Sequence, residues 1–121
     1  MIDFLFVYGT LMRTAGHAAH RLLEQHAQYA GEGYFVGRLY RAANYPVAVA
    51  SSNPGDKVFG ELYRIGNAQA LFAALDEYEG DGFVRCKVPI IGNEAVSDAW
   101  VYLAAEAPAQ LQPIASGRFV D

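Results

Sequence analysis

The sequence predicts an α+β domain in which strands predominate and form a curled mixed sheet or a small barrel. About six segments have the alternating or continuous apolar pattern of strands, whereas only two have the spacing of an amphipathic helix. Turns rich in Gly, Asn, Pro or Ser separate most of these segments. The 121 residues suit one domain and are too few for two ordinary ones, so we expect a single domain over residues 1–121.

The first strand is expected from Phe4, where four large apolar residues precede Tyr8. Such a run is typical of a strand buried on both faces in the middle of a sheet. The turn that follows is Tyr8-Gly9-Thr10-Leu11. Glycine allows a ligand to approach the main chain closely, and exposed N–H groups at such a turn suit carboxylate or phosphate oxygens. A tight turn without a ligand is the alternative interpretation.

The middle of the chain alternates between helix and strand signals. Thr14 can cap a helix that runs to about Gln28, with an apolar stripe made mostly of alanine. Gly31 and Gly33 then open the first of three strands. These strands are expected at residues 34–41, 47–50 and 58–63.

The second helix and a hairpin complete the predicted domain. Asn67 is expected to cap a helix over residues 68–78, which Gly80-Asp81-Gly82 ends. Strands at residues 83–91 and 95–103 then form a hairpin across Gly92-Asn93, a pair suited to a tight connection.

Composition excludes several classes of protein. Hydrophobic residues make up 53% of the chain and charged residues 18%, which excludes disorder. A formal charge of −4 without any basic run argues against a nucleic-acid partner. No apolar run is long enough to span a bilayer and no basic segment begins a signal peptide, so we expect no membrane partner. The single Cys86 cannot form an internal disulfide, which favours a cytoplasmic location.

The best chemical candidate is the acidic end of the second helix. Its four carboxylates lie within six residues, at Asp76, Glu77, Glu79 and Asp81. Mutual repulsion and the negative end of the helix dipole both raise carboxyl pKa values toward the range useful for proton transfer. A solvated acidic surface is the alternative.

Two other features are weaker candidates. Glu61 could carry a proton, although an exposed strand carboxylate is the expected interpretation. His17, His20 and Glu24 fall on one face of the first predicted helix, but no further Cys or His ligand is near in sequence, so we expect no metal site.

Several short motifs follow one another along the chain. They are Val7-Tyr8-Gly9-Thr10-Leu11, Gly37-Arg38-Leu39-Tyr40, Tyr45-Pro46, Val58-Phe59-Gly60-Glu61-Leu62-Tyr63, Leu75-Asp76-Glu77-Tyr78-Glu79-Gly80, Arg85, Trp100-Val101-Tyr102 and Ser116-Gly117. In this order the motifs resemble those of the γ-glutamylcyclotransferase-like family, which includes AIG2-like and short bacterial members. Each motif is weak, but the ordered set covers nearly the whole chain and is fairly specific.

The resemblance implies a small mixed β-barrel flanked by two main helices. It also implies conversion of a small γ-glutamyl amine or γ-glutamyl amino acid to 5-oxoproline, without a cofactor. Glu79 then acts as the general acid and base, and the loop of Tyr8, Gly9, Thr10 and Leu11 binds the glutamyl end. We expect a monomer or homodimer.

One position departs from the family pattern. Where many members have a tyrosine shortly after the glutamate, this chain has Phe83. The alternative to an enzyme is therefore a non-catalytic small-molecule-binding or regulatory protein on the same fold.

Overall fold

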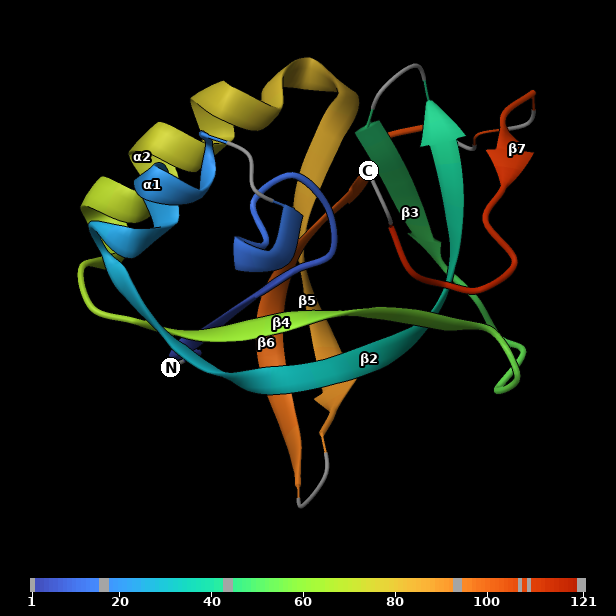
Figure 1. Cartoon of the computed structure of the whole chain (residues 1–121), viewed down its shortest axis with the longest axis horizontal. Helices are drawn as coiled ribbons and strands as arrows, with labels where there is room; N and C mark the ends of the chain where they lie inside the picture. Colours follow the sequence, from blue (N-terminus) through green and yellow to red (C-terminus); the bar gives the residue numbers. More distant parts are fainter. Residues whose placement is uncertain are drawn as a thin grey trace.

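The computed structural model describes residues 2–15, 18–42, 45–92, 95–106, 108 and 110–119. Within this part of the chain, seven strands, two α-helices and two short 3₁₀ helices form one α+β unit (Figure 1). In chain order they are β1 (Phe4–Val7), η1 (Arg13–Ala15), α1 (His20–Glu24), β2 (Ala27–Ala42), β3 (Tyr45–Ala50), β4 (Lys57–Ile65), α2 (Ala68–Glu79), η2 (Gly80–Gly82), β5 (Phe83–Ile91), β6 (Val96–Ala104) and β7 (Gln112–Pro113).

Five of these strands form a closed barrel. The order β2-β4-β1-β6-β5 returns to β2 through the pairing of Tyr34 with Ile91. β1 is the central strand: it runs antiparallel to β4 and parallel to β6, while the other pairings are antiparallel. β3 and β7 pair with the second half of β2, outside the closed part. The expected mixed barrel is confirmed.

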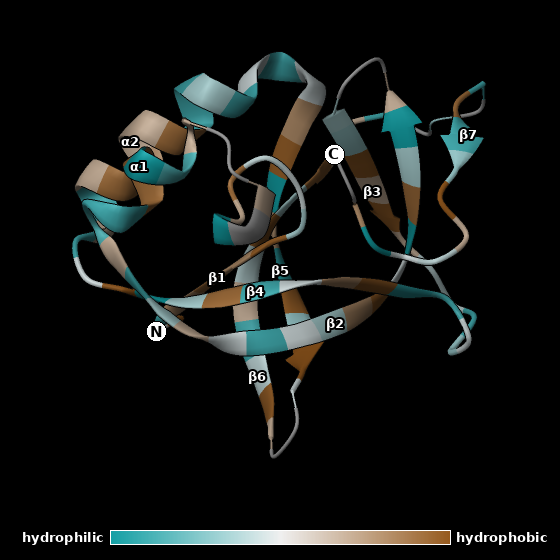
Figure 2. Ribbon diagram, viewed as in Figure 1, coloured by the Kyte–Doolittle hydropathy of each residue, from teal (hydrophilic) through white to brown (hydrophobic). Residues whose placement is uncertain are grey.

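The core lies inside the barrel and under the helices. Leu5, Phe6 and Val7 of β1 are almost completely buried, as the continuous apolar run predicts. Figure 2 shows this strand as a hydrophobic stretch crossing the centre of the molecule. The two α-helices lie together on one flank, where Leu23 of α1 and Leu75 of α2 are fully buried (Figure 1). None of the helices in the described residues is long and apolar enough to cross a membrane.

The predicted start and end of the second helix are confirmed. The Oδ1 atom of Asn67 accepts a hydrogen bond from the backbone N–H of Ala70 at 3.1 Å. This satisfies one of the free N–H groups of the first turn of α2. At the other end Gly80 has a φ of 74°, a left-handed conformation that glycine adopts without strain, and η2 follows.

The predicted helix from Thr14 to Gln28 is wrong. The described residues there form only η1 and the five-residue α1, and the side chain of Thr14 lies outside what the structure describes. From Ala27 onward the backbone pairs with β4 instead, starting with Ile65. Sheet pairing thus takes over residues whose local pattern suits a helix. Gly31 and Gly33 consequently lie inside β2, and Gly31 marks a shift in strand register.

The predicted hairpin is confirmed. β5 and β6 pair continuously from Phe83 with Ala104 to Ile91 with Val96. β5 ends at Ile91 and β6 begins at Val96, and the N–H of Gly92 donates to the carbonyl of Ala95 at 2.9 Å, so Gly92 is hydrogen-bonded across the hairpin instead of lying in its turn. Asn93 of the predicted turn lies outside the described residues.

Candidate active site

One cavity of about 460 Å³ opens between the end of β1, the start of β3, the C-terminal end of α2 and β6. Its lining includes all five residues expected from the sequence, namely Tyr8, Gly9, Thr10, Leu11 and Glu79. The remaining lining residues are Phe6, Val7, Tyr45, Pro46, Tyr78, Gly82, Phe83 and Tyr102. The fold therefore brings together a loop and a carboxylate that are about 70 residues apart in the chain.

The loop after β1 is held in a defined shape. The N–H of Met12 donates to the carbonyl of Gly9 at 3.0 Å and closes a tight turn. Thr10 Oγ1 is hydrogen-bonded to the Tyr78 hydroxyl at 2.7 Å, which ties the loop to the end of α2. Among the described residues, no group accepts a hydrogen bond from the N–H of Gly9, Thr10 or Leu11. These donors are available for a ligand oxygen.

Gly9 is required for a reason that its sequence context does not reveal. Its φ is not positive, so the turn does not depend on the left-handed conformation. A Cβ atom at this position would lie 2.7 Å from Cγ of Pro46. The absent side chain therefore makes room for Pro46, the adjacent residue of the cavity lining, and not only for a ligand. The valine side chain of a Gly9→Val variant would displace Pro46, and it would also hinder a ligand from approaching the backbone of the loop.

Glu79 is the last residue of α2, and its half-buried carboxyl group lines the cavity. Within the described residues, no hydrogen bond or ion pair engages this carboxyl group. Burial raises the pKa of Glu79 to about 7. A carboxyl group with this pKa can both accept and return a proton near neutral pH.

The predicted direction of this pKa shift agrees with the structure, but the predicted cause does not. Repulsion from the neighbouring carboxylates was expected, whereas burial accounts for the shift. Asp76, one turn earlier, accepts a hydrogen bond from the Tyr102 hydroxyl at 2.5 Å and lies 3.4 Å from the Arg85 guanidinium. Its charge is thereby balanced. Glu77 and Asp81 are exposed, where water screens them.

Tyrosines form much of the cavity wall, and of these only Tyr8 is expected there from the sequence. The buried Tyr8 hydroxyl donates to the carbonyl oxygen of Tyr102 at 2.5 Å, which joins the start of the loop to β6. Burial is the main cause that raises the pKa of both phenols, so neither ionises near neutral pH. On another wall the rings of Tyr45 and Phe83 pack at a centroid distance of 6.4 Å. The one sequence signal for Tyr102 is the motif Trp100-Val101-Tyr102, which is part of the family resemblance.

Comparison with known proteins agrees with this geometry. The family described as "Gamma-glutamyl cyclotransferase, AIG2-like" matches residues 5–121. The chain belongs to this family. No curated protein sequence matches the chain.

Solved structures of the AIG2-like fold superpose closely on this chain. The uncharacterized protein PH0828 from Pyrococcus horikoshii is 25% identical, with a TM-score of 0.76 over 97% of this chain and 89% of its own. An AIG2-like protein from Mus musculus is 24% identical, with a TM-score of 0.77 over 98% and 88%. The protein ytfP from Escherichia coli is 29% identical, with a TM-score of 0.64 over 98% and 96%. At 24% identity, the likeness to the mouse protein supports only a shared fold.

Of the weaker candidates, Glu61 and His20 do not line the cavity of this AIG2-like domain. Glu61 was expected to be exposed, but its side chain is only 2% exposed and does not line the cavity. At this point the backbone of Arg13 lies against the carboxyl group and its N–H donates to Oε1 of Glu61. The His20 ring is hydrogen-bonded to the carbonyl of Leu11 at 2.8 Å. His17, the other predicted histidine, lies outside the described residues.

Proposed function

We propose that this AIG2-like protein converts a small γ-glutamyl compound to 5-oxoproline and a free amine. The observation that carries the proposal is the Glu79 carboxyl group, with a pKa of about 7, in the same cavity as three backbone N–H groups that donate to none of the described residues. In the reaction the substrate's own α-amine attacks its γ-carbonyl carbon. A new C–N bond closes the five-membered ring, and the C–N bond to the leaving amine breaks.

Glu79 handles the protons of this exchange. The α-ammonium group must lose a proton before its nitrogen can attack, and the leaving nitrogen must gain one before it departs. A single carboxylate that accepts the first proton and donates it in the second step balances the reaction without any other reagent. The nucleophile belongs to the substrate, so the protein needs to supply position, charge stabilisation and proton transfer.

The cavity favours binding of the glutamyl end by the main chain. None of its lining residues, all of which the structure describes, is Lys, Arg or His. A substrate carboxylate would therefore meet the N–H groups of Gly9, Thr10 and Leu11. The α-ammonium group would meet Glu79, the one charged residue of the lining. The volume of about 460 Å³ suits a small molecule.

The test is a screen of γ-glutamyl amines, γ-glutamyl amino acids and glutathione for release of 5-oxoproline. We expect turnover of at least one class, and loss of that turnover in Glu79→Gln. Binding of these compounds without release of 5-oxoproline would instead indicate a binding or regulatory protein on the same fold. Phe83, which lines the cavity without a hydroxyl group, is the observation that favours this second function.

The pKa of Glu79 predicts the pH dependence of the reaction. Glu79 must be ionised to accept the first proton, and its pKa in the free protein is about 7. The value of kcat/KM should therefore rise with pH through about 7 and level off above it, because kcat/KM reports groups of the free enzyme. Initial rates across roughly pH 5 to 9 measure this curve. A rate that stays constant across that range would contradict the assigned proton carrier.

A further inference from the structure

Glu61 is the one buried charged side chain among those that the structure describes. It lies on β4 opposite Val7 of β1, and it does not line the cavity. Removing a carboxylate from water is costly unless hydrogen bonds and charges compensate. The partners of this carboxylate should therefore indicate what it does.

Two donors share one oxygen atom of the Glu61 carboxylate. The backbone N–H of Arg13 donates to Oε1 at 2.7 Å, and the Tyr63 hydroxyl donates to the same atom at 2.9 Å. The other oxygen, Oε2, is buried without a hydrogen bond to the described residues, although the Arg13 Nε atom lies 3.6 Å away. A short bond from a backbone N–H to a charged acceptor is among the stronger hydrogen bonds in proteins.

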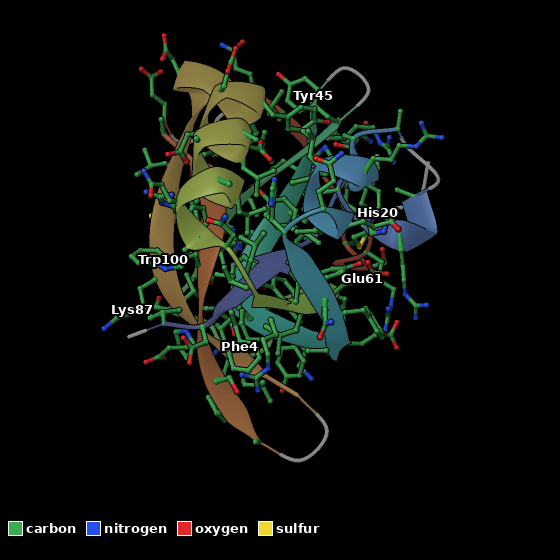
Figure 3. All side chains as sticks on the ribbon, turned by 90° about the vertical axis from the view of Figure 1, so that its left-hand side faces the viewer. Phe4, His20, Tyr45, Glu61, Lys87 and Trp100 are labelled. Carbon is green, nitrogen blue, oxygen red and sulfur yellow. The ribbon has the colours of Figure 1, made fainter. Side chains whose placement is uncertain are left out.

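Arg13 lies two residues after Leu11, the last residue of the loop that lines the cavity. The bond to Glu61 therefore attaches the chain just beyond this loop to the barrel. The start of the loop is attached through the Tyr8 hydroxyl, and its last residue through the bond between the Leu11 carbonyl and the His20 ring. Figure 3 shows Glu61 and His20 on the same side of the molecule, well away from Tyr45 on the cavity wall. The unengaged N–H groups of Gly9, Thr10 and Leu11 lie between these attachments.

We propose that Glu61 is a positioning residue, whose buried carboxylate holds the Arg13 amide and thereby orients the loop that binds the substrate. This inference rests on the proposed function, since it assigns the loop to binding of the glutamyl end. It separates the roles of two carboxylates. Glu79 faces the cavity and transfers protons, whereas Glu61 acts from behind the loop without contacting the substrate.

The decisive comparison is between Glu61→Gln and Tyr63→Phe. Glu61→Gln keeps the size and one acceptor oxygen but removes the charge from the bond to the Arg13 amide. Tyr63→Phe removes the second donor to the same oxygen and leaves the Arg13 bond in place. A carboxylate that merely stabilised the barrel would make both variants alike in their kinetics. A positioning carboxylate makes them differ.

We expect Glu61→Gln to raise KM about tenfold, because hydrogen bonds to charged groups are stronger than neutral ones. The value of kcat should stay within about twofold, because the loop binds the glutamyl end equally well in the ground state and in the transition state. Tyr63→Phe should leave KM within about twofold, and both variants should keep the pH midpoint set by Glu79. If Glu61→Gln does not fold, Glu61→Asp replaces it in the comparison. Aspartate keeps the charge but holds it farther from the Arg13 amide, because its side chain is one methylene group shorter.

A second measurement separates this inference from the proposed function. Amide chemical shifts and hydrogen exchange of Gly9, Thr10 and Leu11 report the loop in the ligand-free protein, whether or not any substrate is turned over. Faster exchange in Glu61→Gln but not in Tyr63→Phe supports the inference. Unchanged loop amides in Glu61→Gln would overturn it, as would an equal rise of KM in both variants or a shifted pH midpoint.

Discussion

Glu79→Gln should lower kcat by a factor of at least about 10² to 10⁴ while substrate binding persists. Glutamine keeps the size and can still form hydrogen bonds in the cavity. It cannot accept the proton of the α-ammonium group or return one to the leaving amine. The measurement is the rate of 5-oxoproline release at saturating substrate, with ligand affinity determined separately by calorimetry.

The same substitution two positions earlier supplies the control for this experiment. Glu77 lies on α2 but is exposed to solvent, so Glu77→Gln should retain close to the full rate. Loss of activity in both variants would point to a disturbed helix. A Glu79→Gln protein that works at the rate of the unaltered chain would show that another group carries the proton.

Stability should also respond to this substitution in a pH-dependent way. The pKa of Glu79 is raised from 4.5 to about 7 in the folded protein, so between these values the folded state binds more protons than the unfolded state. The free energy of unfolding therefore falls as pH rises through this window. Glutamine has no such dependence. Glu79→Gln should gain stability relative to the unaltered chain between about pH 5 and about pH 8.

Gly60→Ala should destabilise the fold by at least about 3 kcal/mol and lower Tm by on the order of 10 °C. A Cβ atom at Gly60 would lie 2.2 Å from the carbonyl oxygen of Val7 on the neighbouring strand. That oxygen belongs to the backbone of the central strand, so it cannot turn aside as a flexible side chain could. Relief would require β1 and β4 to separate, which would open the barrel beside the cavity.

Gly82→Ala provides the matched control, with stability measured by chemical denaturation of both variants. Gly82 has no positive φ, and no heavy atom lies within 4 Å of the Cβ that alanine would add. Its free energy of unfolding should change by less than about 0.5 kcal/mol. If Gly60→Ala is as stable as this control, β1 and β4 do not approach as closely as the structure shows.

The site was predictable from the sequence where local chemistry and order along the chain agreed. The loop from Tyr8 to Leu11 and the carboxylate at Glu79 each looked unlike a purely structural segment. Their family resemblance placed them in one pocket, and the cavity contains both. The tyrosine wall was not predicted beyond Tyr8. Tyr102 reaches the cavity because β6 pairs with β1, which is far away in the chain, and Tyr45 because β3 lies beside β6.

The sequence by itself determined the elements that short-range rules control. Asn67 begins α2 because its side chain satisfies a free N–H group of the first turn. Gly80 ends it because glycine adopts a positive φ without strain. The apolar run before Tyr8 is a buried central strand, because such residues are driven out of water on both faces.

Only the tertiary structure decided features that depend on what lies opposite a residue. The stretch before Gln28 has a helical pattern, yet from Ala27 it joins the sheet because β4 offers it a partner. Glu61 has the pattern of an exposed strand residue, yet it is buried and accepts a hydrogen bond from the Arg13 backbone. The pKa of Glu79 likewise follows from burial in the cavity and not from its acidic neighbours. Burial is a property of the assembled fold, because it depends on residues far away in the chain.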